Sequence, residues 1–226
     1  MSERMSKSDR AAWASARHLA DLGDLTARWL EGDIASQPGY CGPSDVDDPE
    51  RFVPLLARLN RAGFMTTGSQ AAFDGTGYDG THWQQRAAVE GFTDSWELMD
   101  RLRDLRGIAR GFAVIVHRPE TLPRWRYHYE RAAVVTMRDD RDYTRFGAQL
   151  PRRHIRDSLI GYGICHPDAV KALCSAWQVT VIDLAWGRPD ALWRALEGVV
   201  AADPQRCPYP ICHHNHPELQ RHGDAS

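Results

Sequence analysis

Polar and ionisable side chains are concentrated between Thr66 and Arg86, in a stretch rich in threonine, serine, glutamine, aspartate and glycine. Hydroxyl and amide groups of this kind bind small polar ligands, and glycines let the backbone approach a ligand closely. Asp74 and His82 are suited to general acid–base chemistry, and Arg86 to holding a phosphate or carboxylate. We therefore predict a hydrolase or transferase site here, or a binding site without catalysis.

This predicted site takes a small polar or anionic ligand. Its catalytic groups are Asp74 and His82, and its ligand-binding residues are Thr66, Thr67, Ser69, Gln70, Tyr78, Gln85 and Arg86. Neither a P-loop nor a dinucleotide-binding glycine fingerprint occurs in the stretch. The alternative is a solvated glycine-rich loop between two strands.

Arginines alternate with aromatic residues between Arg124 and Arg131. Arginine beside aromatic rings is typical of surfaces that stack on bases and contact phosphates. The alternative function is therefore an RNA-, DNA- or nucleotide-binding module that uses Arg124, Trp125, Arg126, Tyr127 and Arg131. As a strand, the segment would place its aromatic residues on one face, a pattern that is also typical of a simple amphipathic strand.

Soft metal ligands gather near the end of the chain, at Cys207, Cys212, His214 and His216. Thiolates and imidazoles are the ligands of structural zinc, so zinc is the one cofactor that the sequence suggests. Cys165, His166 or Cys174 could complete such a site. The spacing differs from the usual Cys-x2-Cys, and the alternative is a polar tail with incidental histidines.

Two further acidic features have both a functional and a structural interpretation. Acidic residues between Glu31 and Asp48 could hold a divalent cation, although capping of helices and a solvated surface explain them as well. Asp183 follows a predicted buried strand, where carboxylates either line clefts or cap the next turn.

The composition predicts a globular protein without membrane spans. The chain has 226 residues, 42% of them hydrophobic, and no apolar run approaches the ~18 residues that cross a bilayer. Its polar start lacks the apolar core of a signal peptide, so we expect a cytoplasmic location. The net charge is −6 over residues 1–99, +7 over 100–156 and −3 over 157–226. The basic middle could attract a polyanion, but pairing with the acidic flanks is favoured.

Hydrophobic periodicity predicts an α+β fold with N-terminal helices. A mixed or antiparallel sheet follows, with helices packed on it. Helices are expected over residues 8–20, 24–31, 49–62, 94–106, 167–177 and 189–203, and strands over 64–67, 86–93, 112–117, 132–137, 143–146 and 178–184. We predict one domain over 1–204, with two halves near 1–120 and 121–204 as the alternative, and a Cys/His-rich tail over 205–226.

Several short motifs resemble an uncharacterised family of actinobacteria and their phages. They are Trp29–Asp33, Gln37–Tyr40, Leu59–Phe64, Thr66–Gln70, Gln85–Phe92, Trp177–Asp183 and Trp186–Arg188. The resemblance implies a small cytoplasmic protein without an assigned activity. It leaves open a third function, a non-catalytic phage or host interaction protein stabilised by zinc.

A fainter similarity joins Leu59–Gln70 to small α+β proteins such as the wybutosine-synthesis methyltransferases. Those proteins have cysteine where this chain has Gln70. The similarity therefore implies no thiol chemistry here.

Overall fold

The computed structural model describes residues 5–108, 111–124, 127–161 and 163–201. Its centre is an antiparallel four-stranded sheet in the order β1-β4-β8-β5. These strands are β1 (Met65–Gln70), β4 (Ala88–Thr93), β5 (Phe112–His117) and β8 (Trp177–Asp183). Strand β1 therefore forms one edge of the sheet.

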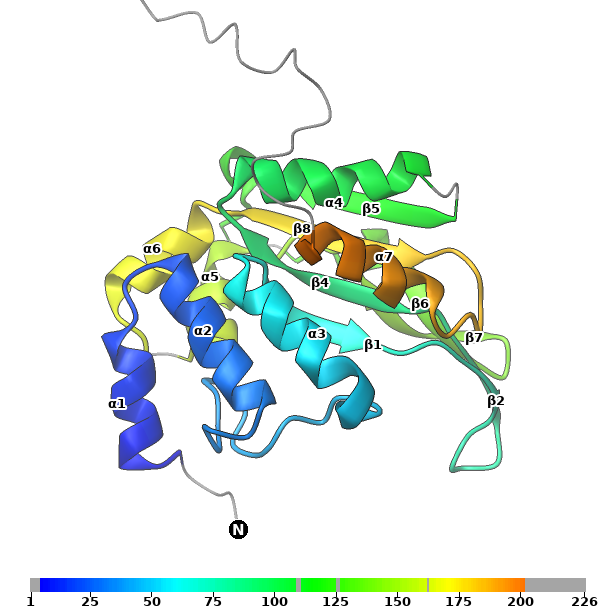
Figure 1. Cartoon of the computed structure of the whole chain (residues 1–226), viewed down its shortest axis with the longest axis horizontal. Coiled ribbons are helices and arrows are strands. Elements are labelled where there is room, and N and C mark those ends of the chain that lie inside the picture. The colour runs from blue at the N-terminus through cyan, green and yellow to red at the C-terminus, as the bar shows by residue number, and fades with distance from the viewer. Residues whose placement is uncertain (1–4, 109–110, 125–126, 162, 202–226) are drawn as a thin grey trace, which may run out of the picture.

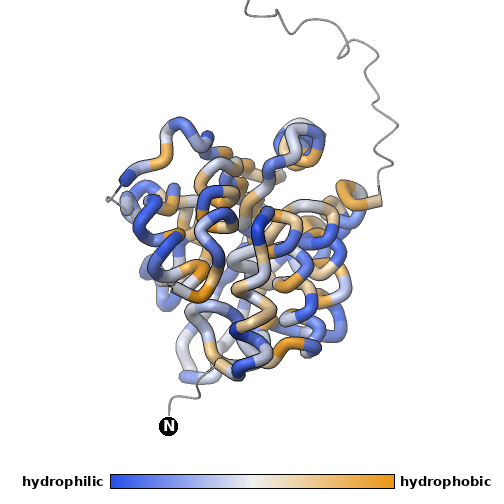
Figure 2. Tube along the Cα trace, turned by 90° about the vertical axis from the view of Figure 1, so that its left-hand side faces the viewer, coloured by the Kyte–Doolittle hydropathy of each residue, from blue (hydrophilic) through white to orange (hydrophobic). Residues whose placement is uncertain are grey.

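Helices cover one face of this first sheet (Figure 1). They are α2 (Leu19–Leu30), α3 (Pro49–Arg61), α4 (Trp96–Ile108) and α7 (Ala191–Ala201), with α1 (Lys7–Ser15) beside α2. One large buried cluster runs from Trp13 in α1 to Val199 in α7. Figure 2 shows the matching alternation of hydrophobic and hydrophilic residues along the chain.

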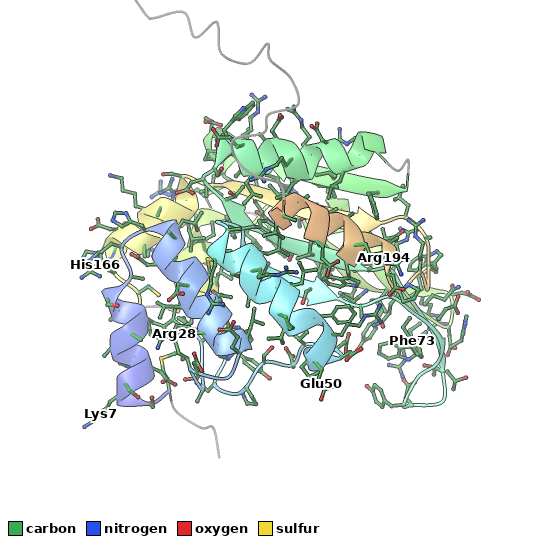
Figure 3. The ribbon with its side chains drawn as sticks, viewed as in Figure 1. Lys7, Arg28, Glu50, Phe73, His166 and Arg194 are labelled. Atoms are coloured by element: carbon green, nitrogen blue, oxygen red, sulfur yellow. The ribbon has the colours of Figure 1, made fainter. Side chains whose placement is uncertain are left out.

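A second antiparallel sheet, in the order β2-β3-β6-β7, packs on the other face of the first. Its strands are β2 (Phe73–Thr76), β3 (His82–Gln85), β6 (Ala133–Arg138) and β7 (Arg141–Phe146). Ala88 and Ile182 of the first sheet meet Val135 of the second in a small buried cluster. The β2–β3 hairpin projects from the body of the molecule (Figures 1 and 3), with Phe73 at its base.

The remaining elements are short. Helix α5 (Arg152–His154) continues into a π-helical turn, Ile155–Leu159, and α6 (Pro167–Cys174) follows. Two 3-10 turns, Pro119–Thr121 and Tyr129–Arg131, flank residues 122–128. Within the described residues, no helix is both long and apolar enough to cross a lipid bilayer.

These sheets and helices confirm the predicted α+β class, with N-terminal helices and antiparallel strands. Helix α3 illustrates why local pattern succeeds. Pro49 occupies its first turn, and its apolar side chains at i, i+3, i+4 and i+7 are buried. Gly63, with φ +96°, ends it in the left-handed conformation that favours glycine.

The expected first helix is divided in two. The prediction of one helix over 8–20 is wrong because the Asp21 carboxylate accepts hydrogen bonds from the backbone N–H groups of Arg17 and His18, at 2.8 and 2.9 Å. Helix α1 therefore ends at Ser15, and α2 begins at Leu19. Likewise Ser95, and not Asp94, caps α4, by accepting a hydrogen bond from the N–H of Leu98.

The structure also corrects the predicted polar turn after Thr67, and this correction affects the candidate site. Strand β1 continues to Gln70, and residues 73–85 form the β2–β3 hairpin of the second sheet. The strands were missed because most of their side chains are exposed or half-buried, so no apolar alternation marks them. The β6–β7 hairpin was predicted, and Asp139 and Asp140, with φ of +46° and +61°, form its turn.

Candidate functional site

Two adjoining cavities lie along the free edge of β1. The first, which we name the β1-edge cavity, has a volume of about 240 Å3. Its lining residues are Trp13, Gln37, Pro38, Gly39, Tyr40, Met65, Thr66, Thr67, His154, Ser158, Leu159 and Ile160. The second cavity, of about 160 Å3, shares Gln37, Thr66 and Thr67 with the first and adds Ser69 and Asp45. Residues far apart in the sequence therefore meet around one strand edge.

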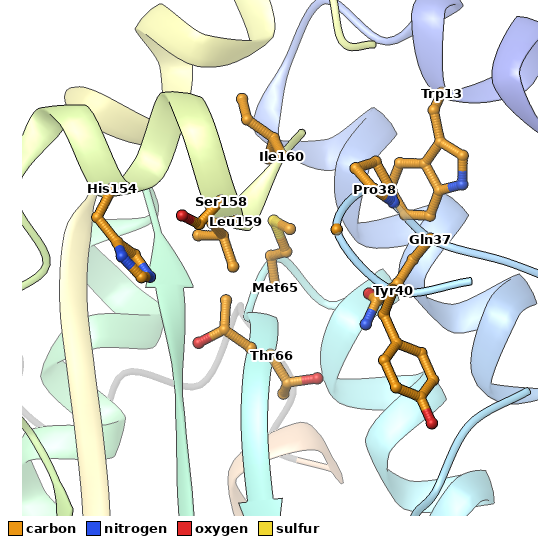
Figure 4. Close-up of a pocket in the computed structure, with 12 residues that line it drawn as sticks. Trp13, Gln37, Pro38, Tyr40, Met65, Thr66, His154, Ser158, Leu159 and Ile160 are labelled. Carbon is orange, nitrogen blue, oxygen red and sulfur yellow. The ribbon is translucent and has the colours of Figure 1, made fainter. Parts of the chain in front are cut away.

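Figure 4 shows how the β1-edge cavity is built. His154 and Ser158 lie on one side, Gln37 and Tyr40 on the other, and Met65 and Thr66 between them. The lining thus combines π-helical residues, a loop and a strand. Polar side chains that converge from separate elements are typical of small-molecule sites.

The loop that carries Gln37 is held rigidly at its turn. Gln37 and Tyr40 exchange backbone hydrogen bonds of 3.0 Å, and Gly39 has a φ of +83°. A Cβ atom on Gly39 would lie 2.5 Å from the carbonyl oxygen of Ser158. Only glycine therefore lets this turn pack against the π-helical segment.

Two buried tryptophans anchor the same loop to the helices. The indole N–H of Trp13 donates to the carbonyl of Ser36 at 3.0 Å, and that of Trp29 donates to the carbonyl of Gly42 at 2.9 Å. Because both ends of the turn are fixed, Gln37 is presented to the cavity without a large loss of loop entropy on binding.

A β-bulge shapes the strand side of the cavity. The register between β1 and β4 shifts between Thr66 and Gly68, so Thr67 is the extra residue. Thr66 is fixed by Asn60, which donates to its hydroxyl at 2.7 Å and accepts its backbone N–H at 2.9 Å. Thr67 donates a long hydrogen bond of 3.4 Å to the carbonyl of Glu90. Bulges often aim side chains in this way beside functional sites.

A line of ionisable groups leads from the sheet to this cavity. Glu90 lies on β4, and its carboxylate accepts the backbone N–H of Gly147 at 3.0 Å. Burial raises the pKa of Glu90, and burial together with the nearby Glu90 charge raises the pKa of Tyr127. The Tyr127 ring stacks on His154, with centroids 5.8 Å apart and planes 10° from parallel. His154 is therefore stacked on a tyrosine whose own pKa is raised by burial and by the Glu90 charge.

The structure brings only part of the sequence-predicted site to this cavity. Thr66, Thr67 and Ser69 line one or both cavities. Gln70 does not. Its amide donates to the carbonyls of Arg86 and Val135 at 3.0 Å each and accepts the hydroxyl of Thr136 at 2.8 Å. Gln70 therefore joins the two sheets and has little capacity left for a ligand.

Arg86 has a structural position as well. Its guanidinium lies 4.0 Å from the Trp186 ring centroid and donates to the carbonyl of Val134 at 3.2 Å. Desolvation lowers its pKa, against the opposing charge of Asp183. Asp183 itself caps the following turn through Ala185, at 2.9 Å, and pairs with Arg188, which favours the capping interpretation of this carboxylate.

Asp74 and His82 do meet, at 2.9 Å, but they lie on the projecting β2–β3 hairpin. Gln84 donates to the same carboxylate at 3.3 Å. Tyr78, at the hairpin tip, is 91% exposed. Gln85 accepts the N–H of Gly187 through its backbone carbonyl. None of these four predicted site residues lines the two cavities along β1.

The proposed nucleic-acid segment is only partly described. Trp125 and Arg126 lie outside the described residues. Tyr129–Arg131 form a 3-10 turn, so this part of the segment is not the amphipathic strand that was considered for it. Arg124 and Arg131 are exposed, and Tyr127, 41% exposed, packs on His154 as described above.

The predicted zinc ligands Cys207, Cys212, His214 and His216 lie outside the described residues. Among the described ones, no group of three His, Cys, Asp or Glu side chains is placed to hold a metal ion. Cys165 and Cys174 are buried, and burial raises the pKa of Cys165 to about 12. In the acidic loop, Glu31 pairs with Arg61.

Sequence reasoning missed His154, Ser158 and Tyr127 as neighbours of the site. The Pro-Gly turn of Gln37–Tyr40 was visible in the sequence, but its partner segment was not. Ser158 has no distinguishing signal, since only the tertiary contact with Gly39 brings it to β1.

The model of a family described as "Domain of unknown function (DUF6919)" matches residues 8–203, and the chain belongs to that family. No curated protein matches it.

Proposed function

We propose that this member of a family of unknown function binds a small, uncharged polar ligand in the β1-edge cavity. The lining residues support an uncharged ligand, since they include no lysine, arginine, aspartate or glutamate. An anion would find no guanidinium there to neutralise it. The ligand class is thus narrower than the polar or anionic compound expected from the sequence.

The observation that carries the proposal is the unused hydrogen-bonding capacity of the lining. Among the described residues, the side chains of Gln37, Ser158 and His154 have no hydrogen-bond partner. Gln70, by contrast, makes three hydrogen bonds within the protein. Gln37 can both donate and accept, and it stands opposite His154 and Ser158 across the cavity (Figure 4).

Apolar groups complete the lining and favour a ligand with a flat or aliphatic part. Met65, Leu159 and Ile160 lie beside Trp13 and Tyr40. A neutral heterocycle, an amide or a nucleoside combines such a surface with donors and acceptors. Sites of this kind are mostly apolar, with a few polar groups that fix orientation.

Native mass spectrometry of the freshly purified full chain, paired with denaturing mass spectrometry, tests the proposal. We expect a co-purifying neutral molecule that is reduced at least tenfold in the double variant Gln37→Met, Ser158→Ala. Gln84→Met, on the projecting hairpin, is the matched control and should retain it. Two results together would contradict the proposal. The purified chain would carry no bound molecule, and its unfolding temperature would not rise with millimolar nucleosides, amides or monosaccharides.

A hydrolase or transferase activity is a second candidate function, favoured by the contact of His154 with Tyr127. We propose that His154 moves the proton, because its ring lines the cavity and stacks on Tyr127. His154→Gln should then abolish turnover of the molecule identified above, whereas His82→Gln should not. Equal turnover in both variants would exclude this role for His154.

A further inference from the structure

We propose that a second pocket, between Trp96 and Trp177, binds a nucleotide unit, either free or within single-stranded nucleic acid. The pocket has a volume of about 580 Å3 and lies apart from the β1-edge cavity in its lining residues. It therefore does not depend on the function proposed above.

Three chain segments meet at this pocket because they all lie at one end of the first sheet. Strand β4 ends at Thr93, opposite Trp177 at the start of β8. Strand β5 ends at His117, opposite Gln178. Trp96, which opens α4, and Arg118, which follows β5, are thereby brought beside Trp177.

The aromatic part of the pocket is unusually open. Trp96 is 54% exposed, although a tryptophan side chain gains much stability from burial. Its ring meets Trp177 with centroids 5.9 Å apart and planes at 61°. This edge contact leaves faces of the pair open, and Met99 and Val116 add apolar surface beside them. Any nucleic-acid base can stack on such a surface, because every base has a planar π-face.

The cationic part suits a phosphate. Arg103 lies 6.0 Å from the Trp96 ring centroid and is paired with Asp100. Arg118 lines the pocket and has no partner for its guanidinium among the described residues. Arg118 is therefore the group available for charge-assisted hydrogen bonds to phosphate oxygens.

Glu120 makes a nucleotide a better match than a simple anion. Its carboxylate lines the pocket and offers hydrogen-bond acceptors, whereas the neighbouring Thr121 hydroxyl is already bonded to the Arg118 carbonyl at 2.9 Å and to the Gln149 amide at 3.1 Å. A bare phosphate or carboxylate would be repelled by Glu120. A nucleotide brings ribose hydroxyls or an exocyclic amino group as donors, so one ligand can satisfy the tryptophans, Arg118 and Glu120 at once.

The test measures binding of two probes to the full chain at low salt, AMP by calorimetry and fluorescein-labelled octaadenylate by fluorescence polarisation. Trp96→Ala and Arg118→Gln should each weaken binding about tenfold or more, since stacking and a phosphate contact are lost. Tyr78→Ala and Arg141→Gln are matched controls, because both side chains are exposed but lie outside the pocket. They should bind as the wild type does.

The two probes distinguish the sources of the nucleotide. Equal affinity for both probes indicates a mononucleotide site, and tighter, salt-sensitive binding of octaadenylate indicates a strand. Either result supports the proposal, provided that Trp96→Ala weakens the binding of the probe. Absence of binding by both probes overturns it, as does an equal loss in the control variants. Unfolding midpoints of Trp96→Ala and Arg118→Gln near the wild-type value show that the fold is intact.

Discussion

Asn60 holds Thr66 through two hydrogen bonds, one to the hydroxyl at 2.7 Å and one from the backbone N–H at 2.9 Å. Asn60 is 1% exposed, and it also donates to the carbonyl of Leu56 in its own helix. The pair joins the end of α3 to the start of β1 across the turn at Gly63. The strand edge that lines the β1-edge cavity is thus fixed from behind by a buried amide.

Asn60→Leu should destabilise the protein by about 2 kcal/mol, because the N–H of Thr66 loses its buried acceptor. Urea unfolding followed by circular dichroism measures the change. Thr67→Val is a suitable control, since the Thr67 hydroxyl makes only one long hydrogen bond, at 3.4 Å. A loss no larger in Asn60→Leu than in the control would show that the buried amide is not what holds β1.

Gln70→Leu should reduce stability by about 2 kcal/mol while leaving occupancy of the β1-edge cavity unchanged. Its side chain bridges Arg86, between β3 and β4, to Val135 and Thr136 of β6 in the second sheet. Removing it leaves polar groups between the sheets without partners. Gln84→Leu, at a half-buried glutamine on the hairpin with one long hydrogen bond of 3.3 Å to the exposed Asp74, should change stability by less than about 0.5 kcal/mol.

The measurement combines thermal unfolding with the native mass spectrum of each variant. The sequence alone places Gln70 among the ligand-binding residues, which predicts a binding defect instead. Loss of the bound molecule in a fully stable Gln70→Leu variant would show that Gln70 binds the ligand and does not bridge the sheets.

The parts of the fold that the sequence predicted are those with a strong local pattern. Helix α3 has its proline start, its apolar face and its glycine stop within fifteen residues. Strands β5 and β8 are continuous apolar or β-branched runs. The β2–β3 hairpin has neither pattern, because its side chains face solvent or other polar groups. Its strand β3 is stabilised by pairing with β6, which no local signal reveals.

The candidate site was predictable only on its strand side. Thr66, Thr67 and Ser69 stood out by type, and all three line a cavity. Gln70 and Arg86 had the same chemical appearance but are used in packing and sheet bridging. Whether a polar side chain is free for a ligand depends on its neighbours, which for Gln70 lie up to 66 residues away.

Gly39→Ala should disrupt the turn that presents Gln37. A Cβ at this position would meet the Ser158 carbonyl at 2.5 Å, and the φ of +83° already disfavours any side chain. Gly32→Ala is a closely matched control, because its φ is +84° and nothing lies within 4 Å of the added Cβ. The control isolates the backbone cost, about 1 kcal/mol.

We expect Gly39→Ala to lose at least about 1 kcal/mol more than Gly32→Ala and to release the co-purifying ligand. Denaturant unfolding and native mass spectrometry provide the two measurements. Equal losses in both variants, with the ligand retained, would show that the turn does not need its contact with Ser158.

Glu90 should make stability depend on pH with a definite sign. Burial raises its folded pKa above that of the unfolded chain, so the native state binds the proton more tightly. The contribution of Glu90 to stability is therefore greatest below its ordinary pKa of 4.5 and is lost as pH rises through the higher folded pKa. Glu90→Gln cannot ionise and keeps an oxygen to accept the N–H of Gly147. The difference in unfolding free energy between wild type and Glu90→Gln, measured by urea titration from pH 4 to 8, should shift in favour of the variant as pH rises. A difference that is constant over this range, or that shifts toward the wild type, would mean that the Glu90 carboxyl ionises in the folded protein at least as easily as in water.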